Sequence, residues 1–265
     1  MDEFRTRYGP WALVAGASEG LGAAFATELA ARGLNVVLVA RRAKELGLLR
    51  ERLVADYGVE VATLVLDLAS PGLSDAIERE TSGLEVGLLV CNAASSVIGP
   101  FLDEPLEKHL IELDLNCRAP LILAHQLGFA MSRRGRGGIL LMSSLAGSQG
   151  APFIATYAAT KAFDRVLAEG LWGELRSQGV DVLACCAGAT RTPRYLDSQP
   201  PGGGSSFVPE MEPSDVAAEA LAQLGRGPRM IPGRGNRVAS LLLRMLPLRT
   251  AIGMMGSQTR AMSGD

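Results

Sequence analysis

A tyrosine and a lysine four positions apart are the residues of this sequence best suited to chemistry. Tyr157 and Lys161 would share one face of a helix, because residues four apart are neighbours on a helix surface. Only three of the 26 basic residues are lysines, and a compact ammonium fits beside a phenol where an arginine fork does not. The ammonium favours the phenolate, so the pair predicts a tyrosine that titrates below its ordinary pKa of about 10. The alternative is a solvated helix face with a cation at a tyrosine edge.

A glycine-rich turn follows the first apolar run and leads directly into an alanine-rich segment, 23–31. Glycines let such a turn tighten, and backbone N–H groups at the start of a helix favour the negative charge of a pyrophosphate. The order of strand, glycines and helix therefore predicts a dinucleotide-binding turn, although a turn with a structural role alone is the alternative. Cofactor contacts are expected from Gly16, Ser18, Glu19, Gly20, Leu21 and Gly22.

The second apolar run ends in Arg41 and Arg42. About 20 residues past such a glycine turn, a carboxylate grips the ribose hydroxyls of NAD, whereas an arginine accommodates the 2′-phosphate of NADP. Two arginines and no acid stand here, so the sequence favours NADP(H) over NAD. The alternative is that both arginines are the solvated start of the next helix.

Short apolar runs alternate with longer helical patterns along the whole chain. Continuous apolar strands without polar alternation are typical of a parallel sheet that helices cover on both faces. The sequence therefore predicts one Rossmann-type, doubly wound α/β domain over residues 1–265, with a substrate loop at 194–210 and a C-terminal covering segment at 233–265. The expected strands are 11–15, 35–40, 60–66, 86–91, 138–142, 180–186 and a short run around 230.

Composition excludes several classes of function. The net charge of −2 gives no electrostatic footprint for nucleic acid, and the longest uncharged stretch, 137–160, is broken by glycines, serines and Pro152, unlike a membrane span. The four cysteines lack Cys-x-x-Cys spacing, and the two histidines lie on one predicted helix, so no metal site is expected. Buried thiols and the absence of an apolar signal core at the N-terminus predict a cytoplasmic protein.

From the first strand to Thr192 the chain resembles the short-chain dehydrogenase/reductase family. Its glycine pattern looks like Gly16-x-x-x-Gly20-x-Gly22, and further family motifs match later positions. Ala15, Ala94 and Ala187 depart modestly from the family pattern. The resemblance implies four catalytic residues, Asn116, Ser144, Tyr157 and Lys161. It also implies cofactor contacts from Asp67, Leu68, Asn92, Ala93, Ala94, Tyr157, Lys161, Gly188, Thr190 and Thr192.

The resemblance gives each catalytic residue a role in hydride transfer between a carbonyl and a secondary alcohol. Tyr157 is the expected acid/base, and Lys161 is expected to bind the nicotinamide ribose. Ser144 can donate to the oxygen that becomes negative, and Asn116 can order a water relay. The alternatives are that Ser144 caps a turn and that Asn116 satisfies a helix carbonyl.

Substrate contacts are expected from Ser144, Gln149, Phe153, Tyr157 and Tyr195. With Ser95, Ser96 and Ala189 they give mainly small or apolar walls, which suit a hydrophobic ketone or acyl chain. Arg191 and Arg194 are candidates for an anionic carrier or ordinary surface residues. The tail resembles those of bacterial ketoacyl and hydroxysteroid reductases; it could cover the site, contact a partner subunit or touch a lipid surface.

Together these features predict an NADP(H)-dependent oxidoreductase for a hydrophobic ketone, 3-ketoacyl or steroid-like substrate, assembled as a homodimer or homotetramer. One alternative is a non-catalytic protein of the same fold that senses NADPH or binds a partner. Another is an epimerase or dehydratase for nucleotide sugars, which would call for a larger C-terminal portion than follows Thr192.

Overall fold

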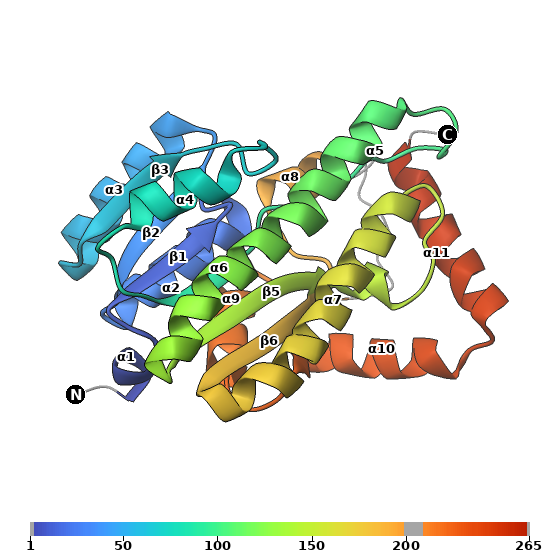
Figure 1. Cartoon of the computed structure of the whole chain (residues 1–265). Coiled ribbons are helices and arrows are strands. Elements are labelled where there is room, and N and C mark those ends of the chain that lie inside the picture. The colour runs from blue at the N-terminus through green and yellow to red at the C-terminus, as the bar shows by residue number, and fades with distance from the viewer. Residues whose placement is uncertain (1–2, 199–208, 264–265) are drawn as a thin grey trace.

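A single seven-stranded sheet forms the centre of the computed structural model, which describes residues 3–198 and 209–263 (Figure 1). All neighbouring strands are parallel, in the order β3-β2-β1-β4-β5-β6-β7. This confirms the predicted doubly wound α/β class. The strands are β1 (Trp11–Ala15), β2 (Asn35–Ala40), β3 (Val61–Val65), β4 (Val86–Cys91), β5 (Gly137–Ser144), β6 (Val180–Ala187) and β7 (Arg229–Met230).

Helices cover both faces of the sheet, which explains why the inner strands are apolar throughout. One face packs on Phe25, Leu46 and Val216, and the other on Leu73, Leu123 and Ala168. The helices of the first face are α2 (Gly20–Ala31), α3 (Ala43–Tyr57) and α9 (Pro213–Gln223). Those of the second are α4 (Leu73–Thr81), α6 (Ala119–Arg134) and α7 (Ala155–Leu175), and a short α1 (Glu3–Tyr8) lies at the N-terminus.

The strand order reverses beside β1, which pairs with β2 on one side and with β4 on the other. In a doubly wound sheet this reversal opens a crevice at the carboxyl ends of the strands, where ligands bind. The glycine turn begins at Gly16, directly after β1, and Asn92 follows β4, so both lie at this crevice. The fold thus brings the expected cofactor segments to one place.

The helix expected to carry both histidines is not uniform. It consists of α5 (Leu106–Leu113), a π-helical turn (Asp114–Arg118) and α6, which follow one another without a break. Wide π turns are rare and often occur at functional sites. The turn contains Asn116, one of the four expected catalytic residues.

The C-terminal elements lie outside the two helical layers. A bridge between Thr190 and Met211 pairs the segments on either side of α8 (Pro193–Asp197) and the predicted substrate loop, whose residues 199–208 lie outside the described residues. Figure 1 shows α10 (Arg234–Met245) and α11 (Leu248–Ser263) meeting at a sharp corner at the edge of the molecule. Among residues 3–198 and 209–263, no helix has both the length and the apolar character needed to cross a membrane.

Candidate active site

The glycine turn is packed too closely for side chains at its key positions. Gly16 has φ +88°, and a Cβ there would lie 2.6 Å from the backbone of Ala93. A Cβ at Gly22 would lie 1.9 Å from the Gly16 carbonyl oxygen, which also accepts a hydrogen bond from Asn92 Nδ2 at 3.0 Å. The turn therefore leaves bare backbone at the start of α2, where a pyrophosphate can approach.

The two arginines after β2 differ in their contacts. Arg42 donates to Ser18 Oγ at 2.9 Å and forms an ion pair with Glu19 at 2.8 Å, so its guanidinium lies against the glycine turn. Arg41 is exposed, and within the described part of the chain it forms no ion pair. A guanidinium at this strand end fits a 2′-phosphate. Arg41 and Arg42 both follow the end of β2, as the sequence predicted.

The remaining cofactor segments also end strands of this half of the sheet. Asp67 is exposed after β3, where its Oδ1 accepts a hydrogen bond from Ala69 N at 3.0 Å, and Leu68 is buried in the core. Ala93 lies directly beneath Gly16, as its N–H donates to the Ala15 carbonyl at 2.8 Å. Asp67 and Ala93 thus lie at the carboxyl edge of the sheet, on the side where the cofactor is expected.

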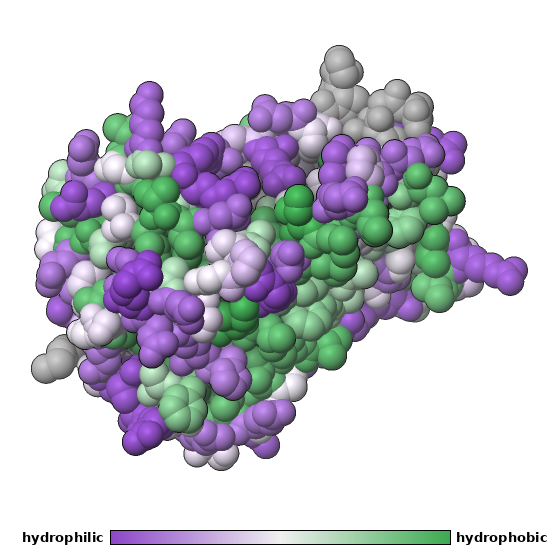
Figure 2. Space-filling view, turned by 45° about the horizontal axis from the view of Figure 1, so that its top comes forward, coloured by the Kyte–Doolittle hydropathy of each residue, from purple (hydrophilic) through white to green (hydrophobic). Residues whose placement is uncertain are grey.

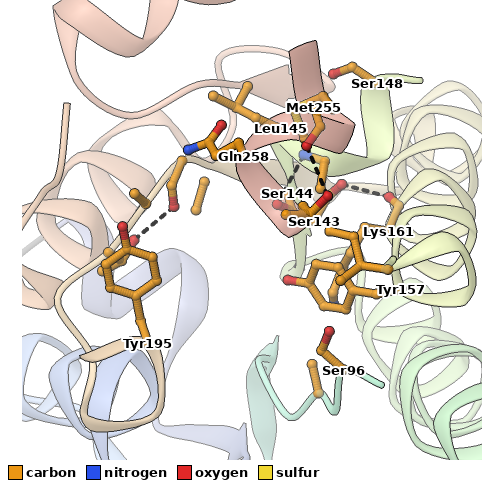
Figure 3. A pocket seen from close by; sticks show the side chains of 18 of the residues that line it. Ser96, Ser143, Ser144, Leu145, Ser148, Tyr157, Lys161, Tyr195, Met255 and Gln258 are labelled. Atoms are coloured by element: carbon orange, nitrogen blue, oxygen red, sulfur yellow. Dashed lines mark hydrogen bonds between the residues drawn. The ribbon is translucent and has the colours of Figure 1, made fainter. Parts of the chain in front are cut away.

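Tyr157 and Lys161 project from one face of α7 into a single cavity (Figure 3). The Lys161 ammonium is buried, lies 5.9 Å from the centre of the Tyr157 ring and donates to the Met142 carbonyl at 2.7 Å. Ser143 Oγ donates to the Lys161 carbonyl at 2.6 Å. The pair is therefore tied to the end of β5 and is not a solvated helix face.

Asp164, which the sequence analysis did not single out, is the buried counter-ion of Lys161. Its Oδ2 lies 2.9 Å from Nζ, and both side chains are almost fully buried. Burial lowers the pKa of Lys161, but Asp164 and Tyr157 together raise that pKa above its ordinary value. Burial raises the pKa of Asp164, and the ammonium only partly offsets it. The three-residue spacing to Lys161 was the available signal, because it places both side chains on one helix face.

Ser144 is the last residue of β5 and lies beside Tyr157 on the cavity wall (Figure 3). Its Oγ accepts a hydrogen bond from Ala146 N at 3.2 Å, so it caps the short helical turn that follows. This contact uses a lone pair and leaves the hydroxyl proton for another acceptor. Ser144 thus does cap the turn, as the alternative proposed, and its hydroxyl can still donate to an oxygen in the cavity.

Asn116 is fully buried and links three elements. Its Nδ2 donates to the Ser95 carbonyl at 2.8 Å and to Thr160 Oγ1 at 3.0 Å, and its Oδ1 accepts from Ser95 N at 2.8 Å. Its side chain therefore hydrogen-bonds to the segment after β4 and to α7. This differs from the alternative that it only bonds to a carbonyl of its own helix. Asn116 fixes the distance between the β4 crevice and the helix that carries Tyr157.

One turn before Asn116, a second buried group was also missed. Glu112 is fully buried, and its Oε2 accepts from Val97 N at 3.4 Å, while no described residue hydrogen-bonds to Oε1. Burial raises the pKa of Glu112 to about 7, against the lowering effects of the Val97 hydrogen bond and of Arg194 and Lys161. Glu112 of α5 and Asn116 of the following π-helical turn thus both hydrogen-bond to the Ser95–Val97 stretch.

The cavity has a volume of about 570 Å³ and walls that are mainly apolar. Phe153 was expected among its residues, but its ring lies against Arg260 and its backbone has φ +66°, so it is not part of the lining. The expected residues that do line it are Leu21, Asn92, Ala94, Ser95, Ser96, Ser144, Gln149, Tyr157, Lys161, Gly188, Ala189, Thr190, Thr192 and Tyr195. Substrate and cofactor segments therefore share one space.

Two arginines near the loop have different partners. Arg191 pairs with Glu210 at 3.1 Å and with Glu212 at 3.2 Å, which supports its interpretation as a surface residue. Arg194 lines the cavity and donates to the Ala94 and Ser96 carbonyls at 3.1 and 3.4 Å. It therefore braces α8 against the segment after β4.

Part of the cavity wall comes from residues near the C-terminus that the sequence analysis did not name. We call Leu243 and Arg244 of α10 and Met255 and Gln258 of α11 the covering wall. Thr259 Oγ1 donates to the Pro152 carbonyl at 2.7 Å and so anchors α11 beside the start of α7. The covering wall encloses the space in front of Tyr157.

The thiols take no part in this site. Cys91, Cys185 and Cys186 are buried, Cys117 is half-buried, and all four are free. Across residues 3–198 and 209–263, no cluster of histidine, cysteine and acidic residues could hold a metal ion.

Comparison with known proteins points to one family. The model of the short chain dehydrogenase family matches residues 10–199. A 7beta-hydroxysteroid dehydrogenase of Collinsella aerofaciens is 33% identical over 88% of this chain and 89% of its own length. A very-long-chain 3-oxoacyl-CoA reductase of Pyricularia oryzae is 39% identical over 66% of this chain and 54% of its own length.

Solved structures agree with these relatives. One from work on the stereoselectivity of 7beta-hydroxysteroid dehydrogenase has a TM-score of 0.90 and 30% identity, and covers 95% of this chain and 98% of that chain. A short-chain dehydrogenase of Sphingobium yanoikuyae in complex with NADPH has a TM-score of 0.77 and 30% identity, and covers 90% of this chain and 97% of that chain.

Proposed function

Because the chain belongs to the short-chain dehydrogenase/reductase family, we propose that it interconverts a ketone and a secondary alcohol on a hydrophobic substrate with NADP(H). Its relatives are named dehydrogenases and reductases, so the chain is an oxidoreductase that acts on CH–OH groups. The observation that carries the proposal is the meeting of Tyr157, Ser144 and buried Lys161 at one apolar cavity.

In this mechanism the chain moves one proton and stabilises one developing charge. NADP(H), when bound, supplies or accepts the hydride. Tyr157 gives its hydroxyl proton to the substrate oxygen during reduction and takes it back during oxidation. Ser144 donates a hydrogen bond to the same oxygen as it becomes negative. Lys161 keeps a positive charge beside the phenol, and Asn116 holds α7 at the right distance from the β4 crevice.

Support for NADP(H) comes from the glycine turn and from Arg41 and Arg42. The turn fits a pyrophosphate because Gly16 and Gly22 leave room only for backbone. Arg42 already lies over Ser18, and Arg41 is exposed beside it, so both could reach a 2′-phosphate on the ribose. No acid ends β2 to bind the ribose of NAD. Asp67 and Thr192 would contact the adenine and nicotinamide ends.

The substrate class follows from the shape and polarity of the cavity. The walls combine Leu145, Ile154, Leu243 and Met255 with several polar side chains, and most of the surface that they expose to the cavity is apolar. The named activities of the relatives concern hydroxysteroids and very-long-chain 3-oxoacyl-CoA, and a related structure is of a bulky-bulky ketone specific alcohol dehydrogenase. These substrates share a large apolar body. We infer a bulky apolar ketone for this chain.

A broad apolar face suggests how subunits assemble. Figure 2 shows a broad hydrophobic band on one face of the molecule. Leu110, Leu121, Phe129 and Val166 of α5, α6 and α7 are large exposed apolar residues. We call these residues the α5–α7 face. Exposed apolar surface of this extent favours contact with a second copy, in a homodimer or homotetramer. Sedimentation equilibrium that finds only monomer would contradict this assembly.

The free thiols further support a reducing, cytoplasmic location.

The loss of NADPH absorbance with a panel of ketones tests the activity. We expect turnover of steroid ketones, 3-ketoacyl thioesters or other bulky ketones, and a strong preference for NADPH over NADH. Arg41→Ala and Arg42→Ala should each raise KM for NADPH about tenfold or more and leave KM for NADH little changed. NADPH binding without turnover of any ketone would instead favour a non-catalytic sensor.

A further inference from the structure

The helix α10 exposes four large apolar residues and buries two uncharged polar ones. Val238, Leu241, Leu242 and Met245 are 58, 62, 59 and 76% exposed. Their spacing of i, i+3, i+4 and i+7 places them on one side of the helix, which we call the α10 face. On the other side, Asn236 and Ser240 are 1 and 7% exposed, although both are polar. A helix that merely covered a core would show the reverse pattern.

The charge around this face has one sign. Between Glu219 and Asp265 the sequence contains seven arginines and no acidic residue, whereas the whole chain has 28 acidic residues and a net charge of −2. Arg237 reaches Glu219 at 3.5 Å, but Arg234, Arg244 and Arg249 form no ion pair with any described residue. The apolar face is therefore flanked by unneutralised guanidinium groups.

The corner between α10 and α11 extends the exposed apolar surface. Met245 precedes it, and Leu248, 64% exposed, follows it with Arg249. Figure 1 shows this corner at the edge of the molecule, away from the sheet. The apolar residues can therefore reach a flat surface before the body of the protein meets it.

We propose that the α10 face and the α10–α11 corner dock on the surface of an anionic lipid bilayer. Leucine, valine and methionine side chains would enter the boundary between headgroups and acyl chains, while the flanking arginines contact anionic headgroups. A second copy of the chain is a poorer occupant. An isologous contact through this face would set Arg234, Arg244 and Arg249 of one protomer against the same residues of the other, without nearby acids to neutralise them.

The same helix connects the proposed bilayer surface to the cavity. Ser240 and Leu243 line the cavity from one side of α10, while the α10 face points outward from the other; Arg244 borders the cavity and is also exposed. A bulky apolar ketone dissolved in the bilayer would then be separated from the cavity of Tyr157 by α10 alone. The docking stands without the proposed activity, whereas delivery of substrate from the bilayer rests on it.

Vesicle co-sedimentation of the full chain tests the docking without any need for turnover. We expect the protein to sediment with vesicles of phosphatidylcholine and phosphatidylglycerol, to remain in solution with phosphatidylcholine alone, and to dissociate as salt is raised. Leu241→Glu/Leu242→Glu should weaken the binding about tenfold or more, because it places charge in the acyl region. Arg234→Gln/Arg249→Gln should weaken binding to the anionic vesicles and make the remaining binding less sensitive to salt.

A matched control comes from α3, where Leu48 is as exposed as Leu242 but lies in a different helical layer. Leu48→Glu should leave vesicle binding unchanged. All variants should keep the far-UV circular dichroism spectrum and the urea unfolding midpoint of the parent, which shows that they are folded. Equal vesicle binding by the parent and Leu241→Glu/Leu242→Glu would overturn the proposal. So would a change from dimer to monomer in that variant without vesicle binding by the parent, since the face would then be a subunit contact.

Discussion

Lys161 is fixed in the cavity by buried hydrogen bonds to β5, the strand that ends in Ser144, whereas Leu243 and Met255 reach the cavity from two helices at the edge of the molecule. We call Tyr157, Ser144 and Lys161 the first set; it is tied to β5 at Lys161, whose ammonium and carbonyl bond to Met142 and Ser143. The covering wall is held by packing and by contacts such as Thr259 to Pro152. We infer that the sheet sets the chemistry and that the C-terminal helices set which substrate enters.

The largest expected effect lies in the first set. Tyr157→Phe should lower kcat by about 10² to 10⁴-fold, because it removes the proton that the substrate oxygen receives. NADPH binding, followed by fluorescence titration, should change little. Tyr195→Phe is the matched control, since Tyr195 also lines the cavity but its hydroxyl contacts Glu210 at 3.1 Å. Similar losses in the two variants would remove the distinction between the catalytic residues and the rest of the wall.

The covering wall should control substrate size and leave the chemistry intact. Met255→Trp would fill part of the cavity, so kcat/KM for bulky ketones should fall by about 10 to 100-fold, while small ketones should be turned over nearly as before. The measurement is steady-state kinetics with a short and a bulky ketone. Met254→Trp, one residue earlier on α11 and outside the lining, should affect neither. Equal losses for both ketones would place the covering wall in the chemistry.

The sequence allowed a good prediction of the part of the site that depends on local patterns. The predicted strand 86–91 matches β4, and the glycine turn, Ser144, Tyr157 and Lys161 all lie at strand ends or on α7 as expected. These features depend on short spacings and on the parallel sheet alone. The cavity wall could not be predicted in the same way, as Phe153 turns toward Arg260 and Met255 takes a place in the wall.

Asp164 shows why some of the site escaped prediction. In the sequence it is one acid among 28, and only the packing of α7 against β5 and β6 buries it beside Lys161. The covering wall depends likewise on how two helices fold back after Met211. The spacing of Asp164 to Lys161 indicates a shared helix face, but it does not indicate that this face is buried. For the tail the sequence offers no such spacing, so three partners remained possible.

A smaller effect should appear when the counter-ion of Lys161 is removed. Asp164 raises the pKa of Lys161, so in Asp164→Asn the ammonium should lose its proton at lower pH, and the alkaline limb of the kcat/KM profile should move down. On the alkaline limb we expect a loss of about tenfold for each pH unit by which the limb moves, and little change near neutrality. Glu174→Gln, at an exposed position of α7, should leave the profile unchanged. An unshifted alkaline limb in Asp164→Asn would show that the ion pair of Asp164 and Lys161 does not affect catalysis.

The smallest expected effect concerns stability and arises behind the catalytic residues, at Glu112. Its pKa is raised to about 7 in the folded protein from an ordinary value of 4.5, so the folded state holds a proton that the unfolded state releases between these pH values. The free energy of unfolding should therefore fall as pH rises from 4.5 to 7, and Glu112→Gln should not show this loss. Urea unfolding measures the free energy of unfolding of the variant and of the parent at each pH. Between pH 4.5 and pH 8, the difference between the two should shift in favour of the variant by about 1–3 kcal/mol. Glu107 is exposed on the same helix, so the free energy of unfolding of Glu107→Gln should follow that of the parent at every pH. If the curves of unfolding free energy against pH were parallel for the parent and Glu112→Gln, Glu112 would be ionised as usual behind the Ser95–Val97 stretch.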